Sequence, residues 1–336
     1  MRIRGLWLSV AFALTMSGLT GAELAVASVP GGGGVFEVGR LSVGTSWVAV
    51  DLEGSFTDPV VVAGPASLVD TEPVTVRVRN VSVSGFELRL EEFGYQDGVH
   101  AAEDVAWLVV ESGTHTLDSG AVVEAGTASA DSTFTAVSFS ATFAAAPVVA
   151  TAVVSNVDTD ATVVRVDGLT ASGFEVALQE QEDSTGGHGS ELVTWVAWSA
   201  GSDDGALDEL AWEAASIGAD ETGATATFTQ MYGESCVLAS LNSHNDADVA
   251  NVRLDNRGPS SVELLVTEEE SADPEVDHAI ESVGLVVIDC VEPPAPNPPQ
   301  WEAGTVSVDD EWLSVPIGGA FTESGGGGGP GRGDRR

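Results

Sequence analysis

The feature that most restricts the fold of this chain is an internal repeat with a period of about 88 residues. Residues of the same kind return at the same phase of that repeat: Arg77, Arg165 and Arg253; Phe86, Phe174 and Val262; Glu92, Glu180 and Glu268. A repeat of this length predicts several copies of one small domain, because each copy is long enough to bury a core of its own.

Four similar phrases, FEVG, VEAG, WEAA and WEAG, mark where the copies begin. They predict the following segments: repeat one at 34–120, repeat two at 121–208, repeat three at 209–291, a Pro-rich linker at 292–300, an incomplete repeat four at 301–324 and a Gly/Arg-rich flexible tail at 325–336. The fourth copy breaks off where its Pro-Val-Val should stand. That break is explained either by a native end or by a truncated or frame-shifted reading.

Apolar and polar side chains alternate within each copy, which predicts half-buried β-strands. In VTVRVRN at 74–80 the valines face one side and the Thr and Arg side chains the other. The run VAWLVVES at 105–112 is apolar on both faces, as in a central strand. Each copy holds about six such strands. We therefore expect an all-β fold of tandem six-stranded antiparallel β-sandwich domains, because one open sheet would leave an apolar face in water.

The chain is strongly acidic, with 52 acidic and 12 basic side chains and a formal net charge of -40. Nucleic acid is excluded as a partner, because it would meet a field of its own sign. The 43% hydrophobic content excludes a disordered acidic chain. Every basic residue is Arg, and this composition favours a surface that stays soluble in concentrated salt over a dedicated cation store.

The first 27 residues are typical of a secretory signal peptide, with two arginines, a short apolar run and the motif Ala25-Val26-Ala27. We expect a secreted, extracellular protein without a transmembrane anchor, because no later apolar run is long enough to span a membrane. In an oxidising compartment Cys236 and Cys290 most simply form a disulfide with each other, and two free thiols are the alternative.

The segment FTDPVVVAGPASLVDTEPVTVRVRNVSVSGFELRLEEFGYQDGVHAAEDVAWLVV at 56–110 combines P-V-V-V-A, a following Asp, a Ser-rich turn, G-F-E-L-R-L and a late Trp. In that order it resembles the H-type lectin domain of secreted agglutinins. Residues 139–198 match as well, and repeat three matches in phase more than in identity. The resemblance implies six-stranded sandwiches, assembly in threes, and recognition of galactose or N-acetylgalactosamine without a required metal. Three domains in one chain could close into an intramolecular pseudo-trimer or stay separate, as beads on a string.

The resemblance also implies sugar-binding residues. The family's Asp after the P-V-V-V strand corresponds to Asp70, Asp158 and Asp246, and its late aromatic to Trp107 and Trp195, with no counterpart in repeat three. The family's Arg in the next loop is absent, since Gly98 and Val99 follow Asp97. From the residues alone, each Asp could instead cap its own turn, and each Trp could belong to the core.

A second recurring pattern is H-x-x-E before the last strand: His100 with Glu103, His188 with Glu191, and His278 with Glu281. These side chains could hydrogen-bond sugar hydroxyls beside an aromatic ring, or they could bond only to their own loop. The set falls short of a zinc site, so we expect no metal and no cofactor, although structural calcium could bind among the loop oxygens.

The sequence thus predicts a secreted, multivalent, lectin-like protein whose partners are glycans or glycoconjugates, with weak sites strengthened by sharing one chain. The alternative is a structural or adhesin-stalk repeat protein of the cell surface that binds no ligand. Motifs of nucleophilic, metal-dependent or phosphate chemistry are absent from the sequence, so an enzyme is not expected.

Overall fold

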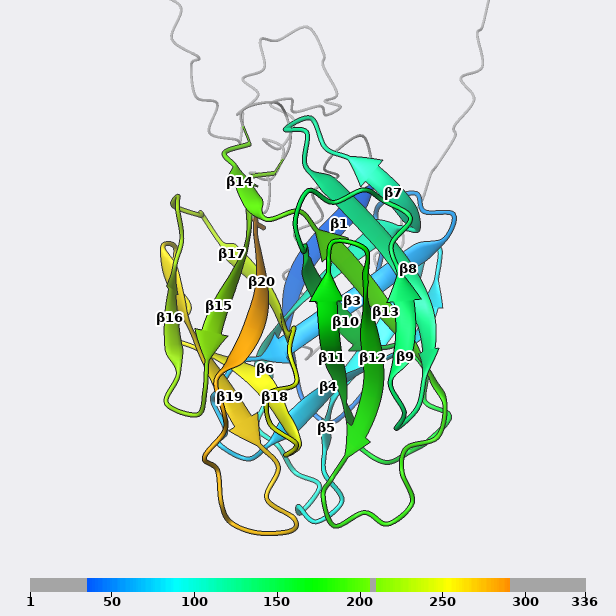
Figure 1. The fold of residues 1–336 in the computed structure, drawn as a ribbon, viewed down its shortest axis with the longest axis vertical. Helices are drawn as coiled ribbons and strands as arrows, with labels where there is room; N and C mark the ends of the chain where they lie inside the picture. The colour runs from blue at the N-terminus through cyan, green and yellow to red at the C-terminus, as the bar shows by residue number, and fades with distance from the viewer. Residues whose placement is uncertain (1–34, 206–209, 291–336) are drawn as a thin grey trace, which may run out of the picture. The chain divides into compact units, whose positions relative to one another are not determined.

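The computed structural model describes residues 35–205 and 210–290. The expected signal peptide, Pro-rich linker, incomplete repeat four and tail lie outside the described residues. Every regular element in this part of the chain is a β-strand (Figure 1), so the all-β expectation is confirmed. No helix in the same part is long and apolar enough to cross a membrane.

The strands fall into three sets of the same order. Repeat one contains β1 (Phe36–Val43), β2 (Val48–Asp51), β3 (Pro59–Ala66), β4 (Val74–Ser82), β5 (Gly85–Glu92) and β6 (Glu103–Glu111). Repeat two contains β8 (Val122–Ala130), β9 (Thr135–Ser138), β10 (Val148–Val153), β11 (Thr162–Thr170), β12 (Gly173–Glu180) and β13 (Glu191–Trp198). Repeat three contains β15 (Trp212–Ala219), β16 (Ala224–Thr227), β17 (Ser235–Leu241), β18 (Ala250–Asp255), β19 (Ser261–Glu268) and β20 (Glu281–Asp289).

In each repeat the last strand pairs with the first and third strands, giving the orders β1-β6-β3, β8-β13-β10 and β15-β20-β17. The remaining strands form a second ladder, β2-β5-β4, β9-β12-β11 or β16-β19-β18. Two short strands, β7 (Gly113–Thr116) and β14 (Gly201–Asp203), extend the first sheet of the following repeat by pairing with β8 and β15. The pairing inside every repeat is antiparallel.

The expected alternation decides which faces are buried. In β5, Phe86, Leu88 and Leu90 are buried while Glu87 and Arg89 between them are only partly covered. The six residues from 105 to 110 in β6 are all buried, as expected for a central strand covered on both faces.

The strand β4 differs from the expectation, because its polar face is buried too. Thr75 is 8% exposed and Arg77 only 1%. The reason is that β4 lies against repeat two, to which it pairs in parallel at Arg77 and Val153. A sequence that alternates polar and apolar residues shows two faces but does not show what covers the polar one.

The three repeats share part of their core. Repeats two and three each have an apolar cluster between their own sheets. The largest cluster is centred on repeat one but includes residues of β10, β13, β15, β17 and β20. Within it one aromatic ring from each repeat meets the next: Phe36 lies 5.9 Å from Trp198, and Trp198 lies 5.4 Å from Trp212, between ring centroids.

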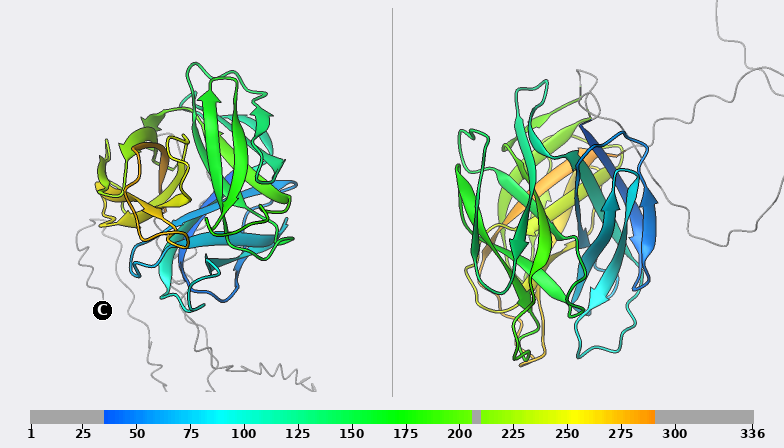
Figure 2. Two further views of the ribbon diagram at one scale, coloured as in Figure 1. Left: turned by 60° about the horizontal axis from the view of Figure 1, so that its bottom comes forward. Right: turned by 90° about the vertical axis from the view of Figure 1, so that its right-hand side faces the viewer.

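The described residues consequently belong to one compact unit, and the beads-on-a-string alternative is wrong for this part of the chain. Figure 2 shows the three strand sets beside one another, coloured blue to cyan, green, and yellow to orange. Where they meet, equivalent residues of β3, β10 and β17 and of β4, β11 and β18 line a small cavity of about 80 Å³. The repeats share packing in addition to the clusters that repeats two and three have of their own.

The side chains around Gly284 explain why repeat three lacks the late Trp. In repeats one and two the Trp faces a glycine on the first strand, Gly39 or Gly126. In repeat three Ser216 faces Gly284. A methyl group at position 284 would overlap the Asn242 side chain.

Asn242 is used to join repeats three and two. Its amide group accepts a hydrogen bond from the Val149 N–H (2.9 Å) and donates one to the Val149 carbonyl (2.7 Å). Repeat three thus has a polar contact with repeat two where the other two repeats have an aromatic core residue.

The two cysteines form a disulfide, as expected, between Cys236 on β17 and Cys290 just after β20. These strands are already hydrogen-bonded to each other. The disulfide encloses most of repeat three, because the two residues are 54 positions apart.

Candidate functional site

The candidate residues that recur in the three repeats gather in the loops at one end of the strands. At the centre of each group lies a glutamate at the start of the last strand, Glu103, Glu191 or Glu281, here called the anchor glutamates. They are 0–2% exposed. Their burial means that their carboxylates must be paired inside the protein.

Each anchor glutamate holds the loop after the third strand of its own repeat. Glu103 accepts hydrogen bonds from the Ser67 hydroxyl (2.5 Å) and from the N–H groups of Val69 and Asp70 (2.9 and 2.8 Å). Glu191 and Glu281 bond the equivalent serines, Ser155 and Ser243, and the equivalent backbone.

The arginines that share one phase, Arg77, Arg165 and Arg253, complete the pairing from the neighbouring repeat, and we call them the ring arginines. Arg77 reaches Glu191 of repeat two (3.4 Å), Arg165 reaches Glu281 of repeat three (2.8 Å), and Arg253 reaches Glu103 of repeat one (3.0 Å). Because the last contact returns to the first repeat, the three pairs form a closed cycle.

The ring arginines also bond backbone carbonyls of the loop that they enter. Arg253 donates to the carbonyls of Ser67 (2.9 Å, from Nε), Asp70 (3.1 Å) and Glu72 (3.0 Å). Arg77 donates in the same way to Ser155 and Asp160. The planar guanidinium, with several donors in fixed directions, suits such a set of acceptors.

The histidines of the H-x-x-E pattern lie between two carboxylates. His100, His188 and His278, the bridging histidines, are 3–7% exposed. One ring nitrogen of each faces its anchor glutamate, at 3.3, 3.7 and 3.4 Å. The other faces the glutamate at the end of the fifth strand, Glu92 (3.6 Å), Glu180 (3.0 Å) or Glu268 (2.5 Å), here called the strand-end glutamates.

The three aspartates predicted to bind sugar, Asp70, Asp158 and Asp246, join two loops of their own repeat. Their carboxylates accept hydrogen bonds from the N–H groups of Ala101 (3.3 Å), Gly189 (3.0 Å) and Ala279 (3.0 Å) respectively. Asp70 and Asp158 also accept from the amide two residues further on, which is the turn-capping alternative. These backbone hydrogen bonds hold the pKa of all three carboxyl groups below the usual range.

The two tryptophans predicted to bind sugar are core residues. Trp107 is 0% exposed and packs edge-on against Phe86, with the ring centroids 5.5 Å apart. Trp195 is 5% exposed and packs against Phe174 and Phe139. Neither ring offers a face to a ligand in this conformation, and the core alternative explains them.

In repeat three the charges of this arrangement have clear electrostatic consequences. Burial opposes ionisation of Glu281, but hydrogen bonds from His278 and Ser243 together with Arg165 outweigh it and lower the pKa of Glu281 to about 2. Burial also opposes the imidazolium form of His278, yet its bonds to Glu281 and Glu268 raise its pKa above the ordinary value. Burial lowers the pKa of Arg165 and Arg253, against the attraction of Glu281 and Glu103.

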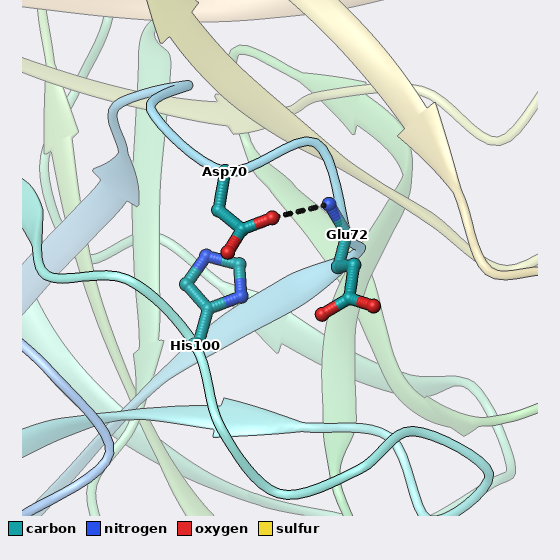
Figure 3. A group of neighbouring side chains, drawn as sticks. All are labelled: Asp70, Glu72 and His100. Carbon is teal, nitrogen blue, oxygen red and sulfur yellow. Dashed lines mark hydrogen bonds between the residues drawn. The ribbon is translucent and has the colours of Figure 1, made fainter.

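Some acidic groups remain at the rim of the loops. In repeat one Asp70, Glu72 and His100 lie together, and Figure 3 shows the Asp70 carboxylate between the Glu72 amide and the His100 ring. Glu72 also groups with Glu92 and Asp97. Comparable groups are Asp158, Glu180 and His188 in repeat two, and Asp248, Glu268 and Glu275 in repeat three.

Sequence reasoning missed the ring arginines and the serines Ser67, Ser155 and Ser243 as parts of this arrangement. The signal was present, because each set recurs at the spacing of the repeat. An Arg recurring on the polar face of a strand has two explanations, solvent exposure or a buried partner. Only contacts between repeats separate them.

The fold and these contacts define an all-β protein of three repeated strand sets tied together by buried ion pairs. No protein-family model and no solved structure matches the chain. It is similar to the curated protein Halomucin of Haloquadratum walsbyi, with 29% identity over 256 residues. That match covers 72% of this chain and 3% of Halomucin, so the chain spans a very small part of the length of its relative.

Proposed function

We propose that this chain is a structural module of an extracellular protein, in which three H-type-lectin-like sandwiches close into an intramolecular pseudo-trimer and act as a rigid spacer. The observation that carries the proposal is that the recurring polar residues bond to one another. The anchor glutamates, ring arginines and bridging histidines are buried in repeat-to-repeat and loop-to-loop contacts. Their recurrence is therefore accounted for by assembly, without a ligand.

Three further features support a structural role outside the cell. The disulfide suits an oxidising compartment. The net charge of -40 suits a surface bathed in concentrated salt. The similarity to 3% of Halomucin places a related segment inside a much longer protein, where a compact unit would serve as one element of a series.

A glycan array tests this proposal directly. The full chain, applied in concentrated KCl with calcium and again with a chelator, is expected to give no sugar-specific signal. Hydrogen exchange on the same sample should show backbone protection of similar strength in all three repeats, as a rigid spacer requires. Binding that free galactose or N-acetylgalactosamine competes away would contradict the spacer proposal.

Carbohydrate binding is the second candidate, favoured by polar hollows at the repeat boundaries. The one between repeats one and two is lined by Asp160, Gln181, Asp183 and Ser184 among others. Carboxylate, amide and hydroxyl groups are suitable partners for sugar hydroxyls. These hollows, and not the buried Trp residues, are where a sugar would bind in this conformation.

The second candidate is tested by replacing an exposed residue of that hollow. Asp183→Ala should abolish any galactose-competed signal, and Asp277→Ala, an equally exposed change in another loop, should leave it intact. Both variants should keep the wild-type melting temperature, since both side chains lie at the surface.

A further inference from the structure

Glu92 in repeat one is buried without the bonds that its counterparts have. Its side chain is 4% exposed, and both carboxylate oxygens lack a hydrogen-bond partner. Nδ1 of His100 lies 3.6 Å from one of these oxygens. In repeat two the equivalent Glu180 is satisfied on both oxygens, by His188 (3.0 Å) and by the Ser184 hydroxyl (2.5 Å).

The other acidic groups around Glu92 disfavour its ionised form further. Glu72 and Asp97 place their carboxylate oxygens within 4.8 Å of the Glu92 oxygens. Burial raises the pKa of Glu92, and the charges of Glu72 and Asp97 raise it further against the opposing effects of the Gly98 amide and His100. A buried carboxylate facing two others needs either a proton or a cation.

His100 does not fully compensate the buried carboxylate of Glu92. If its Nε2 carries the hydrogen and donates to Glu103 (3.3 Å), its Nδ1 presents a lone pair toward Glu92. Nδ1 is itself buried without a hydrogen-bond partner. In that tautomer two unpaired acceptors, one from Glu92 and one from His100, face each other at the edge of the three-carboxylate group.

We propose that the loop end of repeat one binds one Ca²⁺ ion through the carboxylates of Glu72, Glu92 and Asp97. Two oxygens bound to the same calcium ion at about 2.4 Å lie no more than about 4.8 Å apart, which agrees with the spacing of this group. Oxygen ligands and a partly open rim, where water can complete the shell, suit calcium better than zinc. Asp70 belongs to the neighbouring group with Glu72 and His100.

Repeat two provides an internal control, because it has the equivalent strands and loops but lacks the group of three carboxylates. Thr185 occupies the phase of Asp97, and the Glu180 carboxylate is already bonded. The calcium proposal reaches beyond the spacer function, and Glu92 also lines the polar hollow between repeats one and two. The readout of the calcium proposal is metal binding, and the glycan array does not measure that.

Isothermal titration of CaCl₂ into the full chain in concentrated KCl tests the proposal. The wild-type chain should show saturable binding that includes one site lost in Glu92→Gln and kept in Glu180→Gln. Calcium should also raise the melting temperature of the wild-type and Glu180→Gln chains but not of Glu92→Gln.

Asp97→Asn is the second variant, chosen because Asp97 is exposed and its replacement leaves the core untouched. It should weaken saturable binding while the chain melts normally without calcium. Only diffuse, non-saturating uptake in every variant, or equal saturable binding by wild type and Glu92→Gln, would overturn the proposal.

Discussion

The ring arginines are the single residues on which the closed arrangement depends most. Arg253 is 0% exposed, and it bonds Glu103 and three carbonyls of repeat one. Replacing one member of a buried ion pair leaves the other charged and unpaired, at a cost of about 3–5 kcal/mol. We expect Arg253→Met to lower the free energy of unfolding by that amount, measured by denaturant titration at fixed salt.

Arg257 supplies the matched control, because it joins the same two repeats from a more exposed position. Its pair with Asp104 is 2.9 Å long, and the two side chains are 23% and 36% exposed. Partly exposed surface pairs contribute about 0–1 kcal/mol. Equal losses in Arg253→Met and Arg257→Met would show that burial does not set the strength of these contacts.

A pH dependence follows from His278, whose pKa is raised in the folded chain. Such a group stabilises the fold below its unfolded pKa of about 6.5, and this stability is lost as the pH rises through the higher folded value. The melting temperature should therefore fall as the pH is raised above about 6.5. His278→Gln should flatten that fall.

His244 tests the sign of this argument, because burial lowers its pKa. The unfolded chain then binds the proton more readily, so His244 adds stability as the pH rises. His244→Gln should make the fall in melting temperature steeper. A flatter profile in both histidine variants would contradict the assignment of the two environments.

At the scale of strands, alternation predicted much of the fold, because it depends on residues next to one another in sequence. The valines of 74–80 and the apolar run in β6 lie where the period of two puts them. The burial of Arg77 could not be predicted in this way, since only its partner Glu91 is near in sequence and Glu191 of repeat two is 114 positions away. The resemblance pointed to the candidate aspartates and recurrence to the histidines, but their internal bonds depend on loops whose path no local pattern specifies.

In repeats one and two a glycine on the first strand faces the late Trp on the last strand, and this contact explains why both residues recur. A methyl group at Gly126 would come within 2.6 Å of the Trp195 ring. Because Trp195 is held on several sides by aromatic rings, we expect Gly126→Ala to lower the free energy of unfolding by about 1–3 kcal/mol. Gly44→Ala, which meets no atom within 4 Å, is the control, and calorimetry of both variants provides the comparison.

The disulfide should stabilise the strands of repeat three that it joins. For a loop of 54 residues the chain-entropy estimate is about 4 kcal/mol. We expect the double variant Cys236→Ala, Cys290→Ala to unfold with about that loss, measured by denaturant titration. A reducing agent should reproduce the loss in the wild-type chain and leave the double variant unchanged; a shift in the variant would indicate an effect other than the disulfide.

At the scale of the whole molecule, the closed cycle of contacts means that a substitution that destabilises one repeat also destabilises the others. Repeat three contacts repeat two through Arg165 and Asn242, and repeat one through Arg253. The shared aromatic and aliphatic cluster links the opposite end. The length of the repeat predicted small domains. It could not show that the polar faces of those domains would form contacts with one another.

The net charge of -40 opposes this compact arrangement. Repulsion among surface carboxylates is screened over about 3 Å at 1 M salt but extends to about 30 Å at 0.01 M. The buried arginine–glutamate pairs lie away from solvent and are screened much less. We therefore expect the melting temperature to fall steadily as KCl is diluted, with the loss arising from the surface.

Salts of different monovalent cations at equal ionic strength separate screening from specific binding. Screening depends on ionic strength alone, so KCl, NaCl and tetraethylammonium chloride should give nearly the same melting temperature at each dilution. Glu92→Gln should show the same change of melting temperature with salt concentration in calcium-free solution, because one charge in so many changes the surface field little. A melting temperature that stays constant on dilution would mean that surface repulsion does not limit this fold, and the acidic composition would then need another explanation.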